Sequence, residues 1–261
     1  MDEIWKIIIL AVVQGITEFL PISSSGHLVI LKYLFNLNHT GATLEIVLHA
    51  GTLVSIIIFY RLRIIEILTN IINKDKNSIF YVGLIFISLI PAGVLGWFFG
   101  DHIVKIFDRP HLVAILLIIT GIFLLISHFS KPLFLSLGRF TAFLIGIAQM
   151  IALLPGISRS GATIGTARLL GINTNKAAEF SFLMSIPLLM GVIVYKSLSF
   201  YKEEIIDYEI FSLFLGFLVS FLIGYFALTW LVSLLNKGKF WYFGFYCIIV
   251  GSFYVAFISF L

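Results

Sequence analysis

The sequence predicts an all-α polytopic membrane protein built from two inverted repeats. The first observation is composition: of 261 residues, 60% are hydrophobic and only 11% are charged, with a mean hydropathy of +1.10. A soluble domain carries about 25% charged residues, so this chain lacks the polar side chains to cover a soluble globule. Disorder is excluded by the same numbers, because it requires low hydrophobicity and high charge.

The second observation is a set of apolar runs that are long enough to cross a bilayer, which takes roughly 20 residues. They are apolar on every face, unlike the alternating strands of a membrane β-barrel. We therefore expect transmembrane helices near 43–60, 79–100, 111–129, 178–198, 210–235 and 240–260.

The third observation is a pair of apolar segments, 4–35 and 139–172, that are interrupted by charge, proline and glycine. Unpaired backbone groups in hydrocarbon cost several kcal/mol each, so such segments survive only where protein or a water-filled cavity surrounds them. We expect each to form a re-entrant helix pair, which turns at mid-depth and leaves on the side where it entered.

The two broken segments resemble each other at an offset of 135 residues, as Gln14 and Gln149 illustrate. Both contain Ile-Ser-x-Ser-Gly, at Ile22–Gly26 and at Ile157–Gly161. This predicts one membrane domain, 1–261, made of repeat one at about 1–130 and repeat two at about 136–261. Each repeat holds one re-entrant pair and three spans, an odd number, so the second repeat is inverted relative to the first.

The net charge of +4 reports loop charge in a membrane protein and predicts no nucleic-acid partner. The predicted loops on the side opposite the N-terminus carry ten Lys or Arg residues and those on the N-terminal side carry six. Cytoplasmic loops are enriched in Lys and Arg. We therefore expect both termini to lie outside the cell.

The first broken segment places polar groups around a turn. Gln14 and Glu18 are four residues apart and share one helix face, and Pro21 is expected to end that helix. A helix start attracts anions through its free N–H groups and its dipole, and His27 supplies a proton-transfer group or a nucleophile. The hydroxyls that suit the turn and the following N-cap are those of Ser23, Ser24 and Ser25.

The second broken segment adds an arginine amid hydroxyls. Arg159 lies just after the Pro155–Gly156 turn, and its planar fork matches phosphate oxygens in bidentate fashion. The neighbouring donors are Ser158, Ser160 and Thr163. Together the two segments predict a carboxylate, an imidazole, a guanidinium and hydroxyls around a phosphate-sized site.

These motifs resemble a known family. Gln14-xxx-Glu18 followed by Phe19-Leu-Pro-Ile-Ser-Ser-Ser-Gly-His27 is similar to the first signature of the undecaprenyl-diphosphatases, the bacitracin-resistance (BacA) membrane phosphatases. Pro155-Gly-Ile-Ser-Arg-Ser-Gly-Ala-Thr163 is similar to the second signature. The acidic position of the first signature accepts Glu or Gln, and here it is Gln14.

The resemblance implies hydrolysis of undecaprenyl diphosphate to undecaprenyl phosphate and inorganic phosphate, which recycles the lipid carrier for peptidoglycan in the bacterial plasma membrane. The substrate partner is then a polyprenyl diphosphate lipid within the membrane. The resemblance also implies a divalent cation, Mg²⁺ or Ca²⁺, with Glu18 and Gln14 as ligands. We expect Glu18, Ser24, His27 and Arg159 to be catalytic, and Ser23, Ser25, Ser158, Ser160 and Thr163 to bind substrate.

Several alternatives stay open at this point. The nucleophile is Ser24 activated by His27, His27 itself, or a water. Glu45, His49 and Glu179, polar residues within predicted spans, belong either to the site or to a structural network. A lipid or small-molecule transporter or flippase is the second functional class, because inverted repeats with broken helices are its hallmark. A homodimer is one possible oligomeric state.

Overall fold

The computed structural model describes residues 2–35, 42–129, 133, 135–199 and 209–259, and every regular element in these ranges is an α-helix. The all-α prediction is confirmed. The helices are α1 (Asp2–Phe19), α2 (Ser24–Leu34), α3 (Ala42–Phe59), α4 (Arg61–Ile72), α5 (Lys76–Phe107), α6 (Pro110–Phe129), α7 (Arg139–Ile151), α8 (Arg159–Leu169), α9 (Thr174–Ser199), α10 (Ile210–Asn236) and α11 (Tyr242–Ser259).

Four of the described helices, α5, α6, α9 and α10, are long and apolar enough to cross a membrane. A fifth span results if α3 and α4, which are bent by 70° at Tyr60, are taken as one broken span. The apolar part of α11, Tyr242–Ile258, is shorter than these helices. Because a helix rises about 1.5 Å per residue, it covers less of the thickness of a bilayer. Within the described residues, helix length and composition therefore support four or five of the six expected spans.

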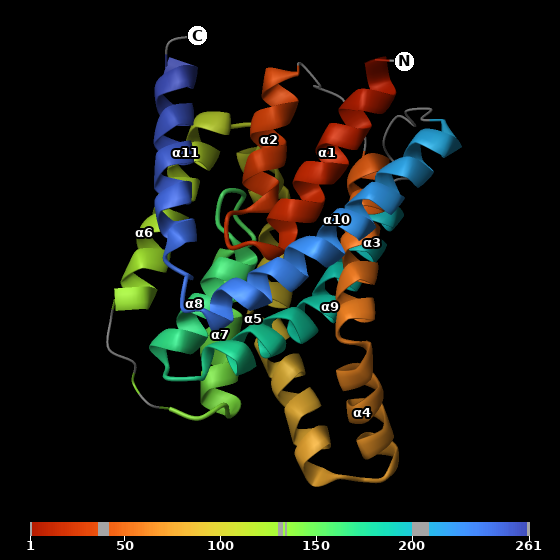
Figure 1. Cartoon of the computed structure of the whole chain (residues 1–261), viewed down its shortest axis with the longest axis vertical. Coiled ribbons are helices and arrows are strands. Elements are labelled where there is room, and N and C mark those ends of the chain that lie inside the picture. The colour runs from red at the N-terminus through yellow and green to blue at the C-terminus, as the bar shows by residue number, and fades with distance from the viewer. Residues whose placement is uncertain (1, 36–41, 130–132, 134, 200–208, 260–261) are drawn as a thin grey trace.

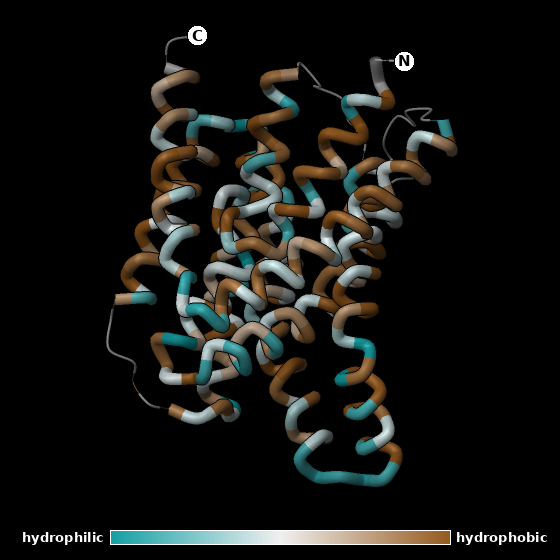
Figure 2. The backbone as a smooth tube through the Cα atoms, viewed as in Figure 1, coloured by the Kyte–Doolittle hydropathy of each residue, from teal (hydrophilic) through white to brown (hydrophobic). Residues whose placement is uncertain are grey.

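The membrane-facing surface is apolar. Trp97 and Phe98 on α5 are 85% and 70% exposed, an arrangement that water would penalise and lipid favours. Hydrophilic residues gather instead at the α4–α5 turn, at the bottom of Figure 2. At this turn Asp75 caps α5 by accepting a hydrogen bond from Ser78 N (2.8 Å), which holds the pKa of the Asp75 carboxyl below its ordinary value.

The first broken segment forms a helix, a turn and a second helix, as predicted. Helix α1 ends at Phe19, two residues before Pro21, and α2 begins at Ser24. Ser23 is the N-cap of α2, with its Oγ accepting from Gly26 N (3.2 Å). The buried ring of Phe19 packs edge-on against Phe182 of α9, which anchors the end of α1 in the core.

The second broken segment repeats this local design. Helix α7 ends at Ile151, and α8 begins at Arg159 behind the N-cap Ser158, whose Oγ accepts from Gly161 N (3.1 Å). Between them Gly156 has φ +96°, and a Cβ there would lie 2.4 Å from Val113 O. Only glycine combines this positive φ with so close an approach to another backbone.

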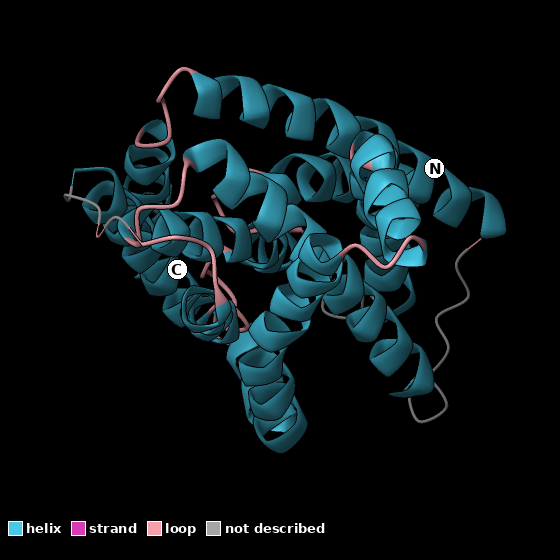
Figure 3. Cartoon of the chain, turned by 90° about the horizontal axis from the view of Figure 1, so that it is seen from below, coloured by secondary structure: helices cyan, strands magenta, loops and turns pink. Residues whose placement is uncertain are grey.

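The two turns meet in the interior of the helical bundle. In Figure 1, α1 and α2 lie side by side and turn downward into the molecule, whereas α7 and α8 lie toward the opposite end. A Cβ on Gly26 would lie 3.1 Å from Gly156 Cα, and Ser160 Oγ donates to Leu20 O (3.3 Å). The start of α1 and the end of α11 lie at the same, upper end of the molecule (Figure 1). Seen from below, helices occupy the centre of the molecule as well as its periphery (Figure 3).

Candidate functional site

The carboxylate of Glu18 joins the two broken segments. Its Oε1 accepts from Arg159 Nη2 (2.6 Å), and its Oε2 accepts from Ser24 Oγ (2.7 Å) and from Gln14 Nε2 (3.1 Å). The Glu18 side chain is 6% exposed and that of Arg159 is 12% exposed. Both charges are thus withdrawn from water, and each serves as the counter-ion of the other.

Local structure explains how these four side chains converge. Gln14 and Glu18 lie one helical turn apart on α1, as their spacing predicted. Ser24 and Arg159 are the first residues of α2 and α8. Contact between the two turns therefore brings the starts of two helices to the last turn of a third.

Two buried polar atoms beside this pair have no hydrogen-bond partner among the described residues: Arg159 Nη1 and Gln14 Oε1. Buried donors and acceptors are nearly always satisfied, so an unpartnered one calls for an explanation. Arg159 Nη1 is a charged donor suited to an anionic oxygen, and Gln14 Oε1 is an acceptor suited to a cation or a donor. This is the polarity that a metal-associated phosphate would meet.

The remaining serines and threonine brace the turns. Ser23 and Ser158 cap their helices, and each hydroxyl lies near a second serine, with Oγ–Oγ distances of 3.3 Å for Ser23–Ser25 and 3.2 Å for Ser158–Ser160. Thr163 Oγ1 donates to Arg159 O (2.8 Å). Direct contact of these hydroxyls with substrate stays a prediction, since the bonds that they make here are structural.

His27 is held by groups other than Ser24. Its Nδ1 lies 2.8 Å from Ser23 O and its Nε2 lies 2.9 Å from Tyr246 OH. A ring with Nδ1–H donating to the carbonyl and Nε2 accepting from the phenol satisfies both contacts. The hydroxyl of Ser24 meets Glu18 instead, so the arrangement favours Glu18 over His27 as the group that takes a proton from Ser24.

Sequence reasoning missed residues that reach the turns from distant helices. Tyr246 of α11 stacks on His27 (ring centroids 5.7 Å apart), although the aromatic run that contains it is typical of a membrane-interface belt. Thr120 Oγ1 of α6 donates to Gly156 O (2.9 Å) and accepts from Ser158 N (3.2 Å). No local pattern marks either residue, because each partner lies far away in the sequence.

Comparison with known proteins places this site in a family. Residues 7–253 match the family described as Bacitracin resistance protein BacA. The chain belongs to this family. The resemblance that the two sequence motifs indicated is therefore confirmed, and BacA membership together with the long apolar helices makes the chain a multi-pass membrane protein.

Several relatives align with this chain over nearly its full length. It is 40% identical to an undecaprenyl-diphosphatase of Bacteroides fragilis over 255 residues, covering 95% of this chain and 96% of the relative. It is 39% identical to an undecaprenyl-diphosphatase of Methanococcus vannielii, with 96% and 99% covered. It is 36% identical to an undecaprenyl-diphosphatase of Halothermothrix orenii, covering 95% of this chain and 96% of the relative.

Two of the three polar residues whose role the sequence left open, Glu45 and Glu179, make contacts between helices, whereas the hydrogen bond of His49 Nδ1 stays within α3. Glu45 of α3 forms an ion pair with Lys32 of α2, and His49 Nδ1 lies 2.8 Å from Glu45 O. Glu179 of α9 accepts from Arg63 Nε of α4 (2.9 Å). These contacts tie neighbouring helices together and favour the structural-network alternative for Glu45 and Glu179.

The BacA site offers few protein ligands to a metal. Within the described residues, no group of three or more His, Cys, Asp and Glu side chains could hold a metal ion. Glu18 supplies one carboxylate and Gln14 supplies an unpartnered amide oxygen. This donor set fits a hard cation of the Mg²⁺ type, which is commonly held by one or two carboxylates together with substrate phosphates and water. It does not form a closed protein cage.

Proposed function

We propose that this BacA-family chain hydrolyses undecaprenyl diphosphate to undecaprenyl phosphate and inorganic phosphate and so recycles the lipid carrier for cell-wall synthesis. The observation that carries the proposal is the buried Glu18–Arg159 pair, which holds Ser24 on one side and presents the unpartnered Arg159 Nη1 on the other. The enzyme name shared by the relatives supports the choice of substrate.

Arg159 binds the terminal phosphate in this proposal. Its Nη1 supplies a donor, while its Nη2 retains or exchanges the bond to Glu18. Enzymatic phosphoryl transfer depends mainly on positioning and on neutralising charge. A guanidinium in a protein-enclosed site meets both requirements: its planar fork positions the phosphate, and its permanent charge neutralises the phosphate oxygens. The helix starts behind Ser23 and Ser158 add partial positive charge.

Ser24 is the nucleophile and Glu18 its base. Ser24 Oγ lies 2.7 Å from Glu18 Oε2, within the reach that proton transfer requires. The Ser24 proton passes to Glu18 as Oγ bonds to the terminal phosphorus and the bridging P–O bond breaks, which releases undecaprenyl phosphate. Water then attacks the phosphorus of the phosphoserine and the P–Oγ bond breaks. Glu18 returns its proton to Ser24 Oγ, and both protons of the water leave with the inorganic phosphate as H₂PO₄⁻, so that free Ser24 and ionised Glu18 are restored. The competing assignments make His27, or a water, the nucleophile.

A divalent cation, Mg²⁺ or Ca²⁺, would be held by Glu18 and Gln14 Oε1. When bound, it would neutralise part of the negative charge of the diphosphate. The unpartnered state of Gln14 Oε1 supports this role. The amide nitrogen of Gln14 already donates to Glu18 (3.1 Å), which fixes the orientation of the amide oxygen.

The membrane arrangement that we propose is the inverted repeat. The matching caps of Ser23 and Ser158, both accepting from the N–H three residues later, support a shared ancestry for the two halves. The Lys and Arg excess at the α4–α5 end supports a cytoplasmic location for that end, with both termini outside, in the bacterial plasma membrane. Cysteines introduced at Asn73 and Asp101, on either side of the α5 span, should then label from opposite sides of intact cells.

The alternative class is a transporter or flippase, and one assay separates the two. Purified protein in detergent has no compartments, so a pure transporter releases no phosphate there. The proposal expects phosphate release from undecaprenyl diphosphate in detergent, and expects Glu18→Gln and Arg159→Ala to lose it. Arg61→Ala, a change in an exposed basic residue of α4 outside the site, is the matched control. Absence of phosphate release from folded wild-type protein would overturn the proposal.

A further inference from the structure

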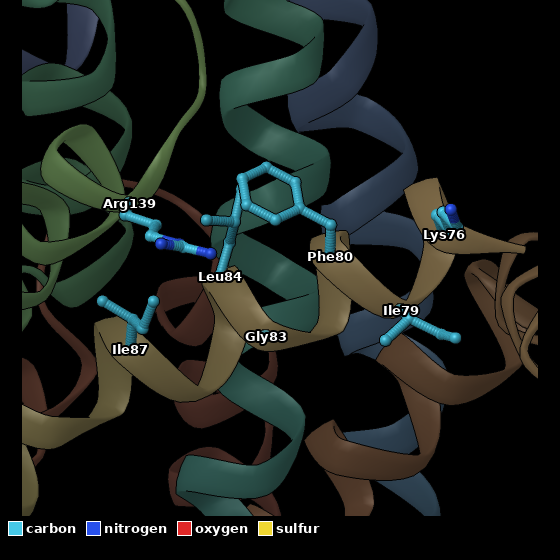
Figure 4. A pocket seen from close by; sticks show the side chains of 7 residues that line it. All are labelled: Lys76, Ile79, Phe80, Gly83, Leu84, Ile87 and Arg139. Carbon is cyan, nitrogen blue, oxygen red and sulfur yellow. The ribbon is translucent and has the colours of Figure 1, made fainter.

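A groove of about 570 Å³ runs along the lipid-facing side of α5 near its start. It is separate from the Glu18–Arg159 site, with which it shares no residue. Its lining residues are Lys76, Ile79, Phe80, Gly83, Leu84, Ile87 and Arg139 (Figure 4).

The sequence of α5 builds the floor and walls of this groove. The α5 residues that line it recur at spacings of three and four, so they share one helix face. Gly83 opens the middle of that face, since a Cβ placed there would meet no atom within 4 Å. Ile79 and Phe80 are 49% and 44% exposed. The result is an apolar groove that lies open to the surrounding membrane.

Two cations flank this groove. Lys76 is the first residue of α5 and Arg139 is the first residue of α7, and the Arg139 guanidinium lies over the Phe80 ring, 5.8 Å from its centroid. Neither belongs to an ion pair within the part of the chain that the structure describes. The acidic residue nearest to Lys76 in the sequence is Asp75, and its carboxylate caps α5 by accepting a hydrogen bond from Ser78 N.

We propose that this groove binds an anionic phospholipid, whose headgroup is attracted by Lys76 and Arg139, toward opposite ends of the groove (Figure 4), and one of whose acyl chains lies along Ile79, Gly83 and Ile87. Charge complementarity argues for an anion, because the lining holds two cations and no carboxylate. The apolar wall argues for a lipid rather than a soluble anion. Both cations begin helices, so the positive ends of two helix dipoles reinforce them. Basic sites of this kind at the ends of transmembrane helices recognise anionic headgroups.

Lipid binding to the purified protein, measured by native mass spectrometry in detergent without substrate, tests the charge arm. We expect phosphatidylglycerol to bind at least 10-fold more tightly than phosphatidylcholine. A basic residue near an anionic headgroup is worth about 5-fold in affinity, so Lys76→Ala/Arg139→Ala should weaken phosphatidylglycerol binding by about 30-fold. Lys105→Ala/Arg109→Ala makes the same charge change at the exposed far end of α5 and should leave it unchanged.

The shape arm uses a second matched pair on the same helix. Gly83→Leu fills the groove, leaves both Lys76 and Arg139 in place, and should weaken binding of phosphatidylglycerol by about 10-fold. Gly93→Leu adds the same side chain where a Cβ also meets nothing within 4 Å, but outside the groove, and should have no effect. Phosphate release should be unchanged in all four variants in detergent, since none alters the catalytic site.

Three results would overturn the proposal. One is equal affinity for the two lipids. Another is an equal effect of the groove pair and the far-end pair. A third is full competition by millimolar inorganic phosphate, which would show a soluble-anion site. These outcomes are distinct from failure of the phosphatase proposal, because lipid binding is measured without substrate and without turnover.

Discussion

Arg159→Lys separates the two tasks that the structure gives to one guanidinium. Nη2 neutralises the buried Glu18 carboxylate at 2.6 Å, while Nη1 has no partner among the described residues and is available to phosphate. Lysine carries its charge on a single nitrogen, so it can serve Glu18 or the phosphate but cannot bridge both. We expect Arg159→Lys to remain folded and to lose activity.

The magnitudes follow from the burial of the pair. Losing one preorganised donor to a transition-state oxyanion costs about 10²–10³ in kcat, which is the expected loss for Arg159→Lys. Arg159→Ala leaves the carboxylate of Glu18, only 6% exposed, without its counter-ion. Breaking a buried pair in this way costs about 3–5 kcal/mol of stability, so this variant should lose stability as well as activity.

The assay combines phosphate release with the thermal unfolding midpoint, both measured in the same detergent. Arg168→Lys is the matched control, because Arg168 lies on the same helix and contacts Thr174 and His128 rather than Glu18. It should keep activity within a few-fold of wild type. Near-wild-type turnover in Arg159→Lys would refute the argument from the two-pronged fork, and would mean that charge alone suffices at this position.

Three further predictions test other contacts of the site. Ser24→Ala should lower turnover by more than about 10³-fold and abolish any phosphoserine trapped by rapid quench; activity within a few-fold of wild type would shift the nucleophile to His27 or water. Tyr246→Phe removes one hydrogen bond to His27 and should leave kcat and its pH profile near those of wild type, because the proposed mechanism uses Ser24 and Glu18; a fall in kcat of about 2–10-fold with a changed pH profile would favour His27 as the nucleophile. Gly156→Ala introduces a methyl 2.4 Å from Val113 O at φ +96° and should lower the unfolding midpoint, whereas Gly93→Ala, in open space within α5, should not; equal midpoints would contradict the close packing of the second turn.

Local signals explain what could be predicted from the sequence. Pro21 cannot continue a helix, and α1 ends two residues before it. Serine is a favoured N-cap, and Ser23, one of the three serines expected at the first turn and N-cap, caps α2. Ser158, expected only as a phosphate donor, caps α8 in the same way. The spacing of Gln14 and Glu18 set them on one helix face, where they are hydrogen-bonded. In each case the cause and its effect lie within a few residues of each other.

Other features depend on contacts that no local pattern encodes. Helix α5 runs from Lys76 to Phe107, beyond the expected span of 79–100, and contains Pro91. Its polar ends extend the helix past the apolar run, and a proline is tolerated where neighbouring groups satisfy the freed carbonyl. The expected span near 43–60 coincides with α3 (Ala42–Phe59), but no sequence pattern indicated the 70° bend at Tyr60 or helix α4 beyond it. One of the alternatives that the sequence leaves open pairs Ser24 with His27, whereas in the structure Ser24 Oγ donates to Glu18. The sequence could not decide this, because it does not fix the direction of a side chain at a turn.

The resting Glu18–Arg159 pair offers a physical reason why a phosphatase can be built inside a membrane. A lone buried charge is expensive, but two opposite charges that share hydrogen bonds offset much of that cost. In the proposed mechanism the incoming phosphate brings its own negative charge to Arg159, which loosens the hold of the guanidinium on Glu18. The carboxylate is then left with Ser24 Oγ at 2.7 Å as its closest remaining donor. Binding of substrate and activation of the nucleophile are thereby the same event, so water without a phosphate in place meets a carboxylate that is already neutralised.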